Sequence, residues 1–251
     1  MSADVVIFAM GGGSWKVTGS DGGWMPLFIN KGINTSPFYA VNCGFTVEWQ
    51  TGFKQAHAGK PLKNVIVSIG DHKSTGELLI TDYGLEGNAI YALSYHIQES
   101  LQTNPATQIT VDFKPSRSLA EISNLLSSTT LPIGKVLTDQ IKISKPAIAL
   151  LKSELSKEEY LDSDILARNI KAFQIPVSKP RSLDEAISTT GGVVTTALSD
   201  RLELKDLPNH YCIGEMVDWY APTGGYLIQG CMSMGKYLAG TLNDSIDATP
   251  I

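Results

Sequence analysis

The hydrophobic residues at the two ends of the chain form patterns typical of one α/β domain. Residues 4–10 contain a continuous apolar run, which predicts a buried strand in a parallel sheet covered on both faces. Residues 211–213 form a second short apolar strand. Residues 226–239 repeat apolar positions at three- and four-residue spacing, which predicts a helix ending near Gly240. We therefore expect the strands of the two ends to pack together.

The middle of the chain has two different patterns. Short runs suited to strands, joined by turns, predict a mainly antiparallel sheet or a small barrel; they lie at residues 45–49, 65–69, 77–81 and 109–113. Residues 116–179 follow a helical pattern that three prolines divide into about three helices. Ser118 and Ser156 each begin a sequence with capping-box spacing.

These patterns predict an α/β protein with a discontinuous domain. Residues 1–34 and 185–251 are expected to form one partial α/β domain. Residues 35–184 are expected to form an inserted α+β domain, with strands to about residue 115 and helices to about residue 179.

Composition narrows the function classes. The 251 residues are 43% hydrophobic and 18% charged, which suits a globular core. The net charge of −5 argues against a nucleic-acid partner. No apolar run approaches the ~18 residues of a membrane span, and no secretory signal is recognisable. Three cysteines without C-x-x-C spacing fit a reducing cytoplasm. The four histidines lack metal-ligand spacing, so no metal site is expected.

Glycine-rich turns follow both predicted parallel strands. Residues 11–13 are three glycines after the first strand, and Gly214 ends the second, followed by the acceptors Glu215 and Asp218. Residues 222–225 form a tight loop before the C-terminal helix. A strand end, a glycine loop and a helix N-terminus together make a ligand site in open α/β sheets. An ordinary strand–turn–helix connection would also use these glycines, and both interpretations stay open.

The same turns resemble those of bacterial flavoproteins described as aminoacetone-oxidase-like FAD-binding enzymes or NAD(FAD)-utilizing dehydrogenases. The resemblance rests on Gly214-Glu215, on residues 223–226, on residues 9–15, and on residues 187–193. It implies that the acidic residue reaches the ribityl chain and that the Thr-Gly-Gly helix start lies against the flavin pyrimidine. Leu227 departs from the family, which often has Asn there.

The resemblance also implies that residues 1–34 and 185–251 form a partial FAD/NAD(P)-binding, Rossmann-like domain, and it implies which residues contact FAD. A loop of the inserted domain, residues 84–87, would close over the flavin. The implied cofactor-binding residues are Gly11, Gly12, Gly13, Ser14, Trp15, Gly214, Glu215, Asp218, Thr223, Gly224, Gly225, Tyr226, Glu86 and Gly87. No catalytic acid or base can be named from the sequence.

The family's opening strand–G-x-G-x-x-G–helix, which holds the FAD pyrophosphate, has no counterpart in this sequence. The expected function is therefore an FAD-dependent oxidoreductase-like flavoprotein, truncated or part of a split protein, that alone binds FAD weakly or not at all. The alternative is a non-enzymatic remnant whose inserted domain binds a partner or ligand. The strand at residues 5–9 should have an exposed sheet edge, which a second copy or a complementary fragment would cover.

Overall fold

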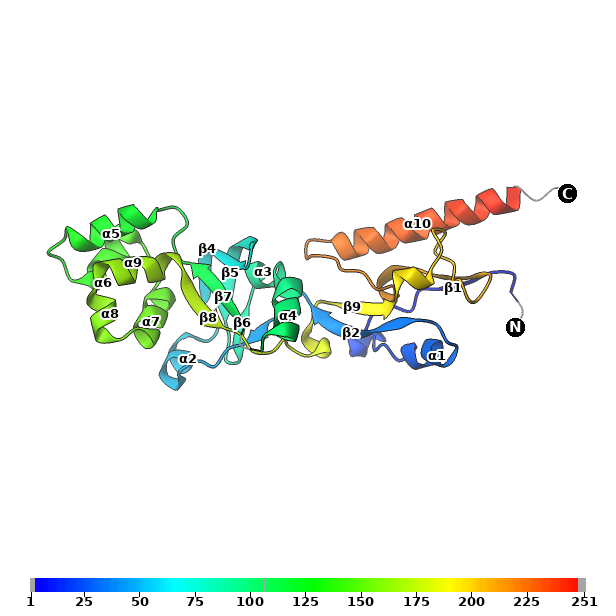
Figure 1. Ribbon diagram of the computed structural model, residues 1–251, viewed down its shortest axis with the longest axis horizontal. Helices are drawn as coiled ribbons and strands as arrows, with labels where there is room; N and C mark the ends of the chain where they lie inside the picture. The colour runs from blue at the N-terminus through cyan, green and yellow to red at the C-terminus, as the bar shows by residue number, and fades with distance from the viewer. Residues whose placement is uncertain (1–2, 106, 248–251) are drawn as a thin grey trace. The chain divides into compact units, whose positions relative to one another are not determined.

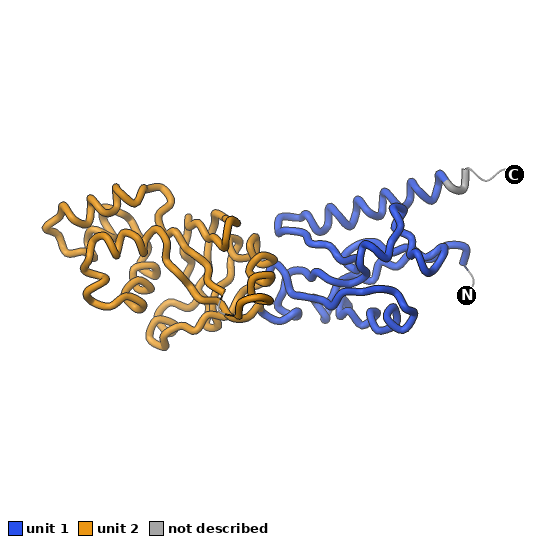
Figure 2. Tube along the Cα trace, viewed as in Figure 1, with its two compact units in different colours: residues 1–42, 181–251 blue, residues 43–180 orange. Residues whose placement is uncertain are grey.

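The computed structural model describes residues 3–105 and 107–247 (Figure 1). The chain divides into two compact units (Figure 2): unit 1 comprises residues 1–42 and 181–251, and unit 2 comprises residues 43–180. The boundaries expected from the sequence were 34/35 and 184/185. The first boundary lies later because β2 (Thr35–Val41) pairs antiparallel with β9 (Ser188–Val193) inside unit 1.

Unit 1 contains the parallel contact that the apolar runs predict. β1 (Val6–Phe8) pairs in parallel with β10 (His210–Cys212), and Ile7 lies opposite Tyr211. The remaining elements of unit 1 are short, except for the last helix. They are η1 (Lys16–Thr18), α1 (Met25–Asn30), η3 (Leu183–Glu185), η4 (Thr195–Ala197), η5 (Gly214–Met216) and α10 (Tyr226–Asp247).

The core of unit 1 is formed by buried residues of α1, β9, β10 and η5. Phe28 of α1 packs edge-on against Trp24 and Phe8, with ring centroids 5.0 Å apart in both pairs. Met216 and Val193 are fully buried in the same cluster. This core anchors the strand ends and the η5 turn, which carry most of the predicted site residues.

Two expectations for unit 1 were wrong. β1 is not covered on both faces, because Val5, Ile7 and Met10 are 39%, 47% and 50% exposed. The only strand paired with β1 among the described residues is β10, so the apolar run lies on an uncovered edge strand. The C-terminal helix does not stop at Gly240 but continues to Asp247. A glycine costs a helix only ~1 kcal/mol, which the flanking helical residues outweigh.

Unit 2 contains a six-stranded antiparallel sheet that curls into a half-barrel. The strands, in sheet order, are β3 (Phe45–Thr46), β6 (Gly84–Glu86), β5 (His72–Ile80), β4 (Pro61–Ile69), β7 (Gln108–Asp112) and β8 (Phe173–Pro176). At the two ends of this order, Phe45 pairs with Pro180, and the Thr46 amide donates to the Lys179 carbonyl at 2.8 Å. The predicted antiparallel sheet or small barrel is confirmed.

The helices of unit 2 surround this sheet and extend beyond one end of it (Figure 1). They are α2 (Thr51–His57), α3 (Asn88–Tyr91), α4 (Ser94–Thr103), α5 (Leu119–Ser127), α6 (Ile133–Lys135), the π-helical turn η2 (Val136–Ile141), α7 (Lys145–Glu154), α8 (Lys157–Leu161) and α9 (Ser163–Lys171). Both predicted capping boxes are present: Ser118 caps α5 and Ser156 caps α8.

The expected helices to residue 179 were wrong at the last segment. Phe173–Pro176 is strand β8, in which buried and exposed residues alternate and which pairs with β7. Its four residues are too few for a helical period to be distinguished from a strand period. Within residues 3–105 and 107–247, no helix has the length and apolarity that a membrane crossing requires.

Candidate functional site

The end of β1, the start of β9 and the η5 turn meet at one buried junction. The Gly13 amide donates to the Thr189 hydroxyl at 3.2 Å, and the Thr189 amide donates to Oε1 of Glu215 at 3.1 Å. A Cβ at Gly12 would lie 2.2 Å from Thr189 Oγ1 and 2.7 Å from the Glu215 carboxyl carbon. Glycine is therefore required at position 12 for the three segments to approach, and this junction brings three predicted site residues together.

Asp218 forms a second carboxylate contact beside the first. Its Oδ1 accepts from the Gly191 amide at 2.9 Å and from the Thr190 hydroxyl at 3.1 Å. The Asp218 amide in turn donates to the Val193 carbonyl at 2.8 Å. Charge-assisted bonds of this kind hold a carboxylate more firmly than neutral bonds do. Both acidic residues are thus positioned by the backbone of β9.

The η5 turn is packed against α10. Trp219 donates from its indole Nε1 to the Gly214 carbonyl at 3.0 Å, and its ring fills the space beside Gly230 of α10. The Gly214 amide donates to the Met234 sulfur at 3.3 Å. Cys231 lies close by, and burial, followed by the nearby Glu215 charge, raises the pKa of its thiol. The strand end and α10 therefore form one packed body.

The loop before α10 is open. Gly224 and Gly225 have φ of 110° and 88°, a region that favours glycine. Both are exposed, and a Cβ at Gly225 would meet no atom within 4 Å. The glycines are therefore needed for the turn and not for packing. Thr223 is half-buried and Tyr226 is 61% exposed, so the amides of the first α10 turn and the positive end of its dipole face accessible space.

The other N-terminal residues of the predicted site have structural partners. The Gly11 carbonyl accepts from the Trp24 indole at 3.0 Å. Ser14 is buried, and Trp15 is 52% exposed in a left-handed conformation with φ of 67°. A left-handed non-glycine residue is uncommon and marks a conformation fixed by its surroundings. Trp15 is the predicted residue in this loop whose side chain remains accessible.

Glu86 and Gly87 belong to unit 2, where they fit the packing of that unit. Gly87 has φ of 106°, and a Cβ there would lie 2.4 Å from the Glu77 carbonyl oxygen of β5. Glu86 accepts a hydrogen bond from the Tyr83 hydroxyl. Burial, and then the Glu86 charge, raise the pKa of Tyr91. The barrel itself therefore accounts for the identity of both residues.

Thr189 is the site residue that sequence reasoning missed. It is 3% exposed and joins Gly13 to Glu215, although it lies 176 residues from Gly13 in the chain. The resemblance included the segment 187–193, but no role was assigned to its threonines. The polar run Ser188-Thr189-Thr190 directly before two glycines is the signal that the sequence offers.

The comparisons with known proteins agree with this architecture. Residues 39–188, a range that includes all of unit 2, match the family described as HI0933-like protein barrel and H2TH domain. The chain is also 27% identical over 256 residues to the 3-dehydro-bile acid delta(4,6)-reductase of Clostridium scindens. That match covers 95% of this chain and 61% of the relative, so the chain spans about three fifths of the relative's length.

These matches support a flavoprotein-related family at large and do not single out the aminoacetone oxidases. The curled antiparallel sheet and the helices that follow it occupy the matched range, and the match extends over more than half of the sequence. The chain therefore belongs to the HI0933-like family, through its barrel and H2TH domain.

Proposed function

We propose that unit 1 supplies the flavin- and ribityl-facing part of an FAD site in an oxidoreductase-like flavoprotein, within a Rossmann-like arrangement. The observation that carries the proposal is the pair of carboxylates, Glu215 and Asp218, held at one strand end by the backbone of β9. Each uses one oxygen for these bonds, and its second oxygen is suited to accept a ribityl hydroxyl. When bound, FAD would supply the redox chemistry.

The N-terminus of α10 fits the other end of the proposed flavin position. Its first-turn amides and dipole favour electron-rich groups such as the pyrimidine carbonyls of an isoalloxazine. The 22-residue length of α10 maintains that dipole, and the Trp219–Gly230 contact fixes the helix against η5. In this proposal Glu215 and Asp218 bind and orient, and α10 stabilises negative charge. The reductase named among the relatives supports the redox class.

The described residues fit the pyrophosphate of FAD poorly. Glycines 11–13 lead into η1, a 3₁₀ turn of three residues, and not into a long helix that could bind phosphates. We therefore propose that a further polypeptide segment binds the phosphates and adds a strand beside β1. A groove of about 580 Å³ next to this strand, lined by Val5, Ile7, Tyr211, Ile213 and Leu238, would be covered by such a segment.

A titration tests the proposal in two steps. The 251-residue chain is titrated with FAD while flavin absorbance and fluorescence are recorded. It is then titrated again with the part of the Clostridium scindens reductase that lies outside the matched region. We expect weak or no binding at first and tight binding with the added part, weakened in Glu215→Gln but not in the exposed control Glu48→Gln.

The outcomes separate the two parts of the proposal. Stoichiometric, tight binding by the chain alone would support the flavin site and contradict the need for a second segment. A folded chain that ignores FAD in both titrations would contradict the flavin site. That result would favour the alternative function, in which unit 2 binds a ligand or partner without redox chemistry.

A further inference from the structure

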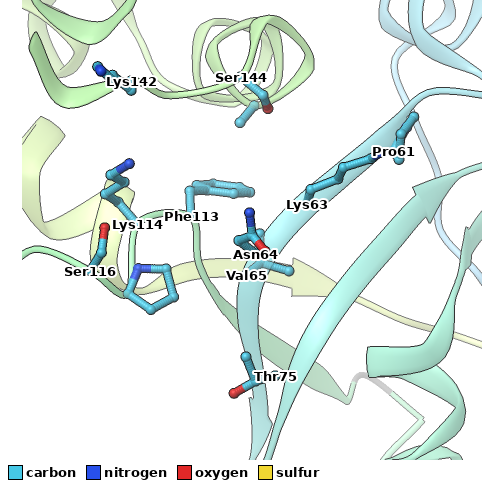
Figure 3. A pocket seen from close by; sticks show the side chains of 12 residues that line it. Pro61, Lys63, Asn64, Val65, Thr75, Phe113, Lys114, Ser116, Lys142 and Ser144 are labelled. Carbon is cyan, nitrogen blue, oxygen red and sulfur yellow. The ribbon is translucent and has the colours of Figure 1, made fainter.

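Unit 2 contains a cavity of about 520 Å³ that none of the sequence motifs predicts (Figure 3). Three lysines from different parts of the chain line it: Lys63 of β4, Lys114 after β7, and Lys142 before α7. Figure 3 shows Lys114 and Phe113 on one wall, Lys63 on the strand opposite, and Lys142 with Ser144 above them. The volume falls in the range of ~300–1,000 Å³ that is usual for small-molecule sites.

Local structure holds the lysine-bearing segments in place. Lys142 adopts φ of 62° at the end of η2, and its amide donates to the Leu137 carbonyl. The Lys114 amide donates to Oδ1 of Asp112 at 2.8 Å, and the Lys114 carbonyl accepts from Nζ of Lys171 at 3.1 Å. The backbone of the cavity wall is therefore pre-organised, and no ligand is needed to order it.

The positive charge at the cavity is only partly compensated. Nζ of Lys171 lies 2.6 Å from Oδ2 of Asp112. The Asp112 carboxylate is therefore paired with Lys171 and does not balance the charge of the cavity lysines. Lys63 approaches Glu77 at 3.9 Å, a weak contact because both side chains are exposed. Among the described residues, Lys114 and Lys142 form no ion pair, and no acidic residue lines the cavity. The cavity lining therefore contains three lysines and no carboxylate.

The start of α7 adds to this positive field. Ser144 and Ala147 line the cavity, and Ser144 is the N-cap of this ten-residue helix. The Ser144 side chain makes no capping hydrogen bond, and the first turn contains no acidic residue. The helix N-terminus thus lacks the carboxylate or hydroxyl acceptor that usually satisfies it. A ligand oxygen would serve as that acceptor.

The floor of the cavity is apolar. Val65, Phe113 and Ala147 are each less than 10% exposed, and the Phe113 ring packs against Phe173 at a centroid distance of 5.5 Å. Residues 43–180 carry equal numbers of basic and acidic side chains. The lysines therefore converge on one hollow in an otherwise neutral unit. A polyanion such as nucleic acid would be expected to need a basic stripe over a wider surface.

We infer that this cavity binds a small organic anion, a carboxylate or a phosphate ester, whose apolar body lies against Phe113 and whose charged group lies between Lys114, Lys142 and the α7 N-terminus. The inference concerns unit 2 alone and does not depend on the flavin proposal. It gives the inserted domain a ligand-binding role of its own, with Lys63, whose side chain is 69% exposed, as a third cation at the rim.

The test uses 2-naphthoate and 2-naphthyl phosphate as probes and neutral 2-naphthamide as the matched control. Dissociation constants come from calorimetry, and the position of binding comes from amide chemical shifts of the ¹⁵N-labelled 251-residue chain. We expect shifts at the non-proline residues of 113–116 and 142–147 with both anions or with one of them, which identifies the preferred charged group. We expect binding of naphthamide to be at least tenfold weaker.

Matched lysine variants test the charge. The double variant Lys114→Gln and Lys142→Gln should weaken anion binding at least tenfold, and the double variant Lys73→Gln and Lys157→Gln, outside the cavity, should change it less than twofold. If the first variant does not fold, as judged by circular dichroism, raising the salt concentration with the unchanged chain should weaken naphthoate and leave naphthamide unaffected.

Several results would overturn the inference. These are equal binding of the neutral amide, shifts confined to other residues, an equal loss in the control variant, or salt-independent anion binding. A short DNA duplex that shifts the same amides and binds more tightly than both small anions would replace it with a nucleic-acid site.

Discussion

The contact between Trp219 and Gly230 is predicted to decide the stability of the α10 attachment. A Cβ at Gly230 would lie 2.3 Å from Cη2 of Trp219, whereas ordinary contacts are 3.4–4 Å. Gly230→Ala therefore requires the indole to move by about 1 Å or more. Gly240→Ala in the same helix is the matched control, because a Cβ there meets no atom within 4 Å.

The two substitutions should change stability with opposite signs. Both replace glycine by alanine in a helix, which contributes ~1 kcal/mol of stabilisation. At Gly230 this gain is opposed by ~1–3 kcal/mol of overpacking. Displacing the indole also loosens its hydrogen bond to the Gly214 carbonyl, worth ~0.5–1.5 kcal/mol. We expect Gly230→Ala to be about 1.5–4.5 kcal/mol less stable than Gly240→Ala.

Urea unfolding followed by circular dichroism measures this difference, with tryptophan fluorescence as a second probe. Replacing Trp219 by Leu in the Gly230→Ala background should recover part of the loss, because the two residues are in contact and their effects are not additive. Equal unfolding midpoints for Gly230→Ala and Gly240→Ala, with equal slopes, would show that Trp219 does not pack as described and that α10 is attached by other contacts.

Three further predictions concern caps, thiols and a partly buried ion pair. Ser118→Ala should cost ~0.5–2 kcal/mol by removing the α5 cap. Hydrogen bonding to Ser118, first through its amide, lowers the pKa of Glu121 below its usual value near 4.5, so the contribution of the Glu121 carboxylate to the cap is present above pH 4.5 and is lost as the pH falls through the folded-state pKa; urea midpoints that fall equally with acid in Glu121→Gln would contradict this. Burial raises the pKa of Cys212 to about 12, so this thiol should resist alkylation at pH 8 until the chain is unfolded, and rapid native labelling found by mass spectrometry would refute its burial. Lys171→Met should destabilise unit 2 by ~1–3 kcal/mol, because it leaves the Asp112 carboxylate and the Lys114 and Arg117 carbonyls without the Lys171 donor. Lys171→Arg should recover part of this loss in thermal unfolding, and equal unfolding temperatures for Lys171→Met and the unchanged chain would show that the ion pair contributes nothing.

Local sequence patterns determined the elements whose partners are close in the chain. The hairpin of β4 and β5 follows from two short strands predicted at residues 65–69 and 77–81. The polar loop expected over residues 70–76 is shorter, because β5 begins at His72, which pairs with Ile69. The capping boxes at Ser118 and Ser156 each depend on a residue three positions away. The parallel contact of β1 and β10 was also predictable, because both apolar runs end in glycine turns that a sheet brings to one edge.

Long-range packing decided the rest. The apolar run of β1 predicted a covered strand, but exposure depends on which neighbours exist, and β10 alone pairs with it among the described residues. Phe173–Pro176 is too short for its own pattern to predict a strand, and its pairing with β7 decided its conformation. Thr189 meets Gly13 across 176 residues, and the cavity lysines come from three separate segments. Neither set of residues follows a fixed spacing in the sequence that could have been recognised, because the residues come together only when the strands and helices that carry them pack.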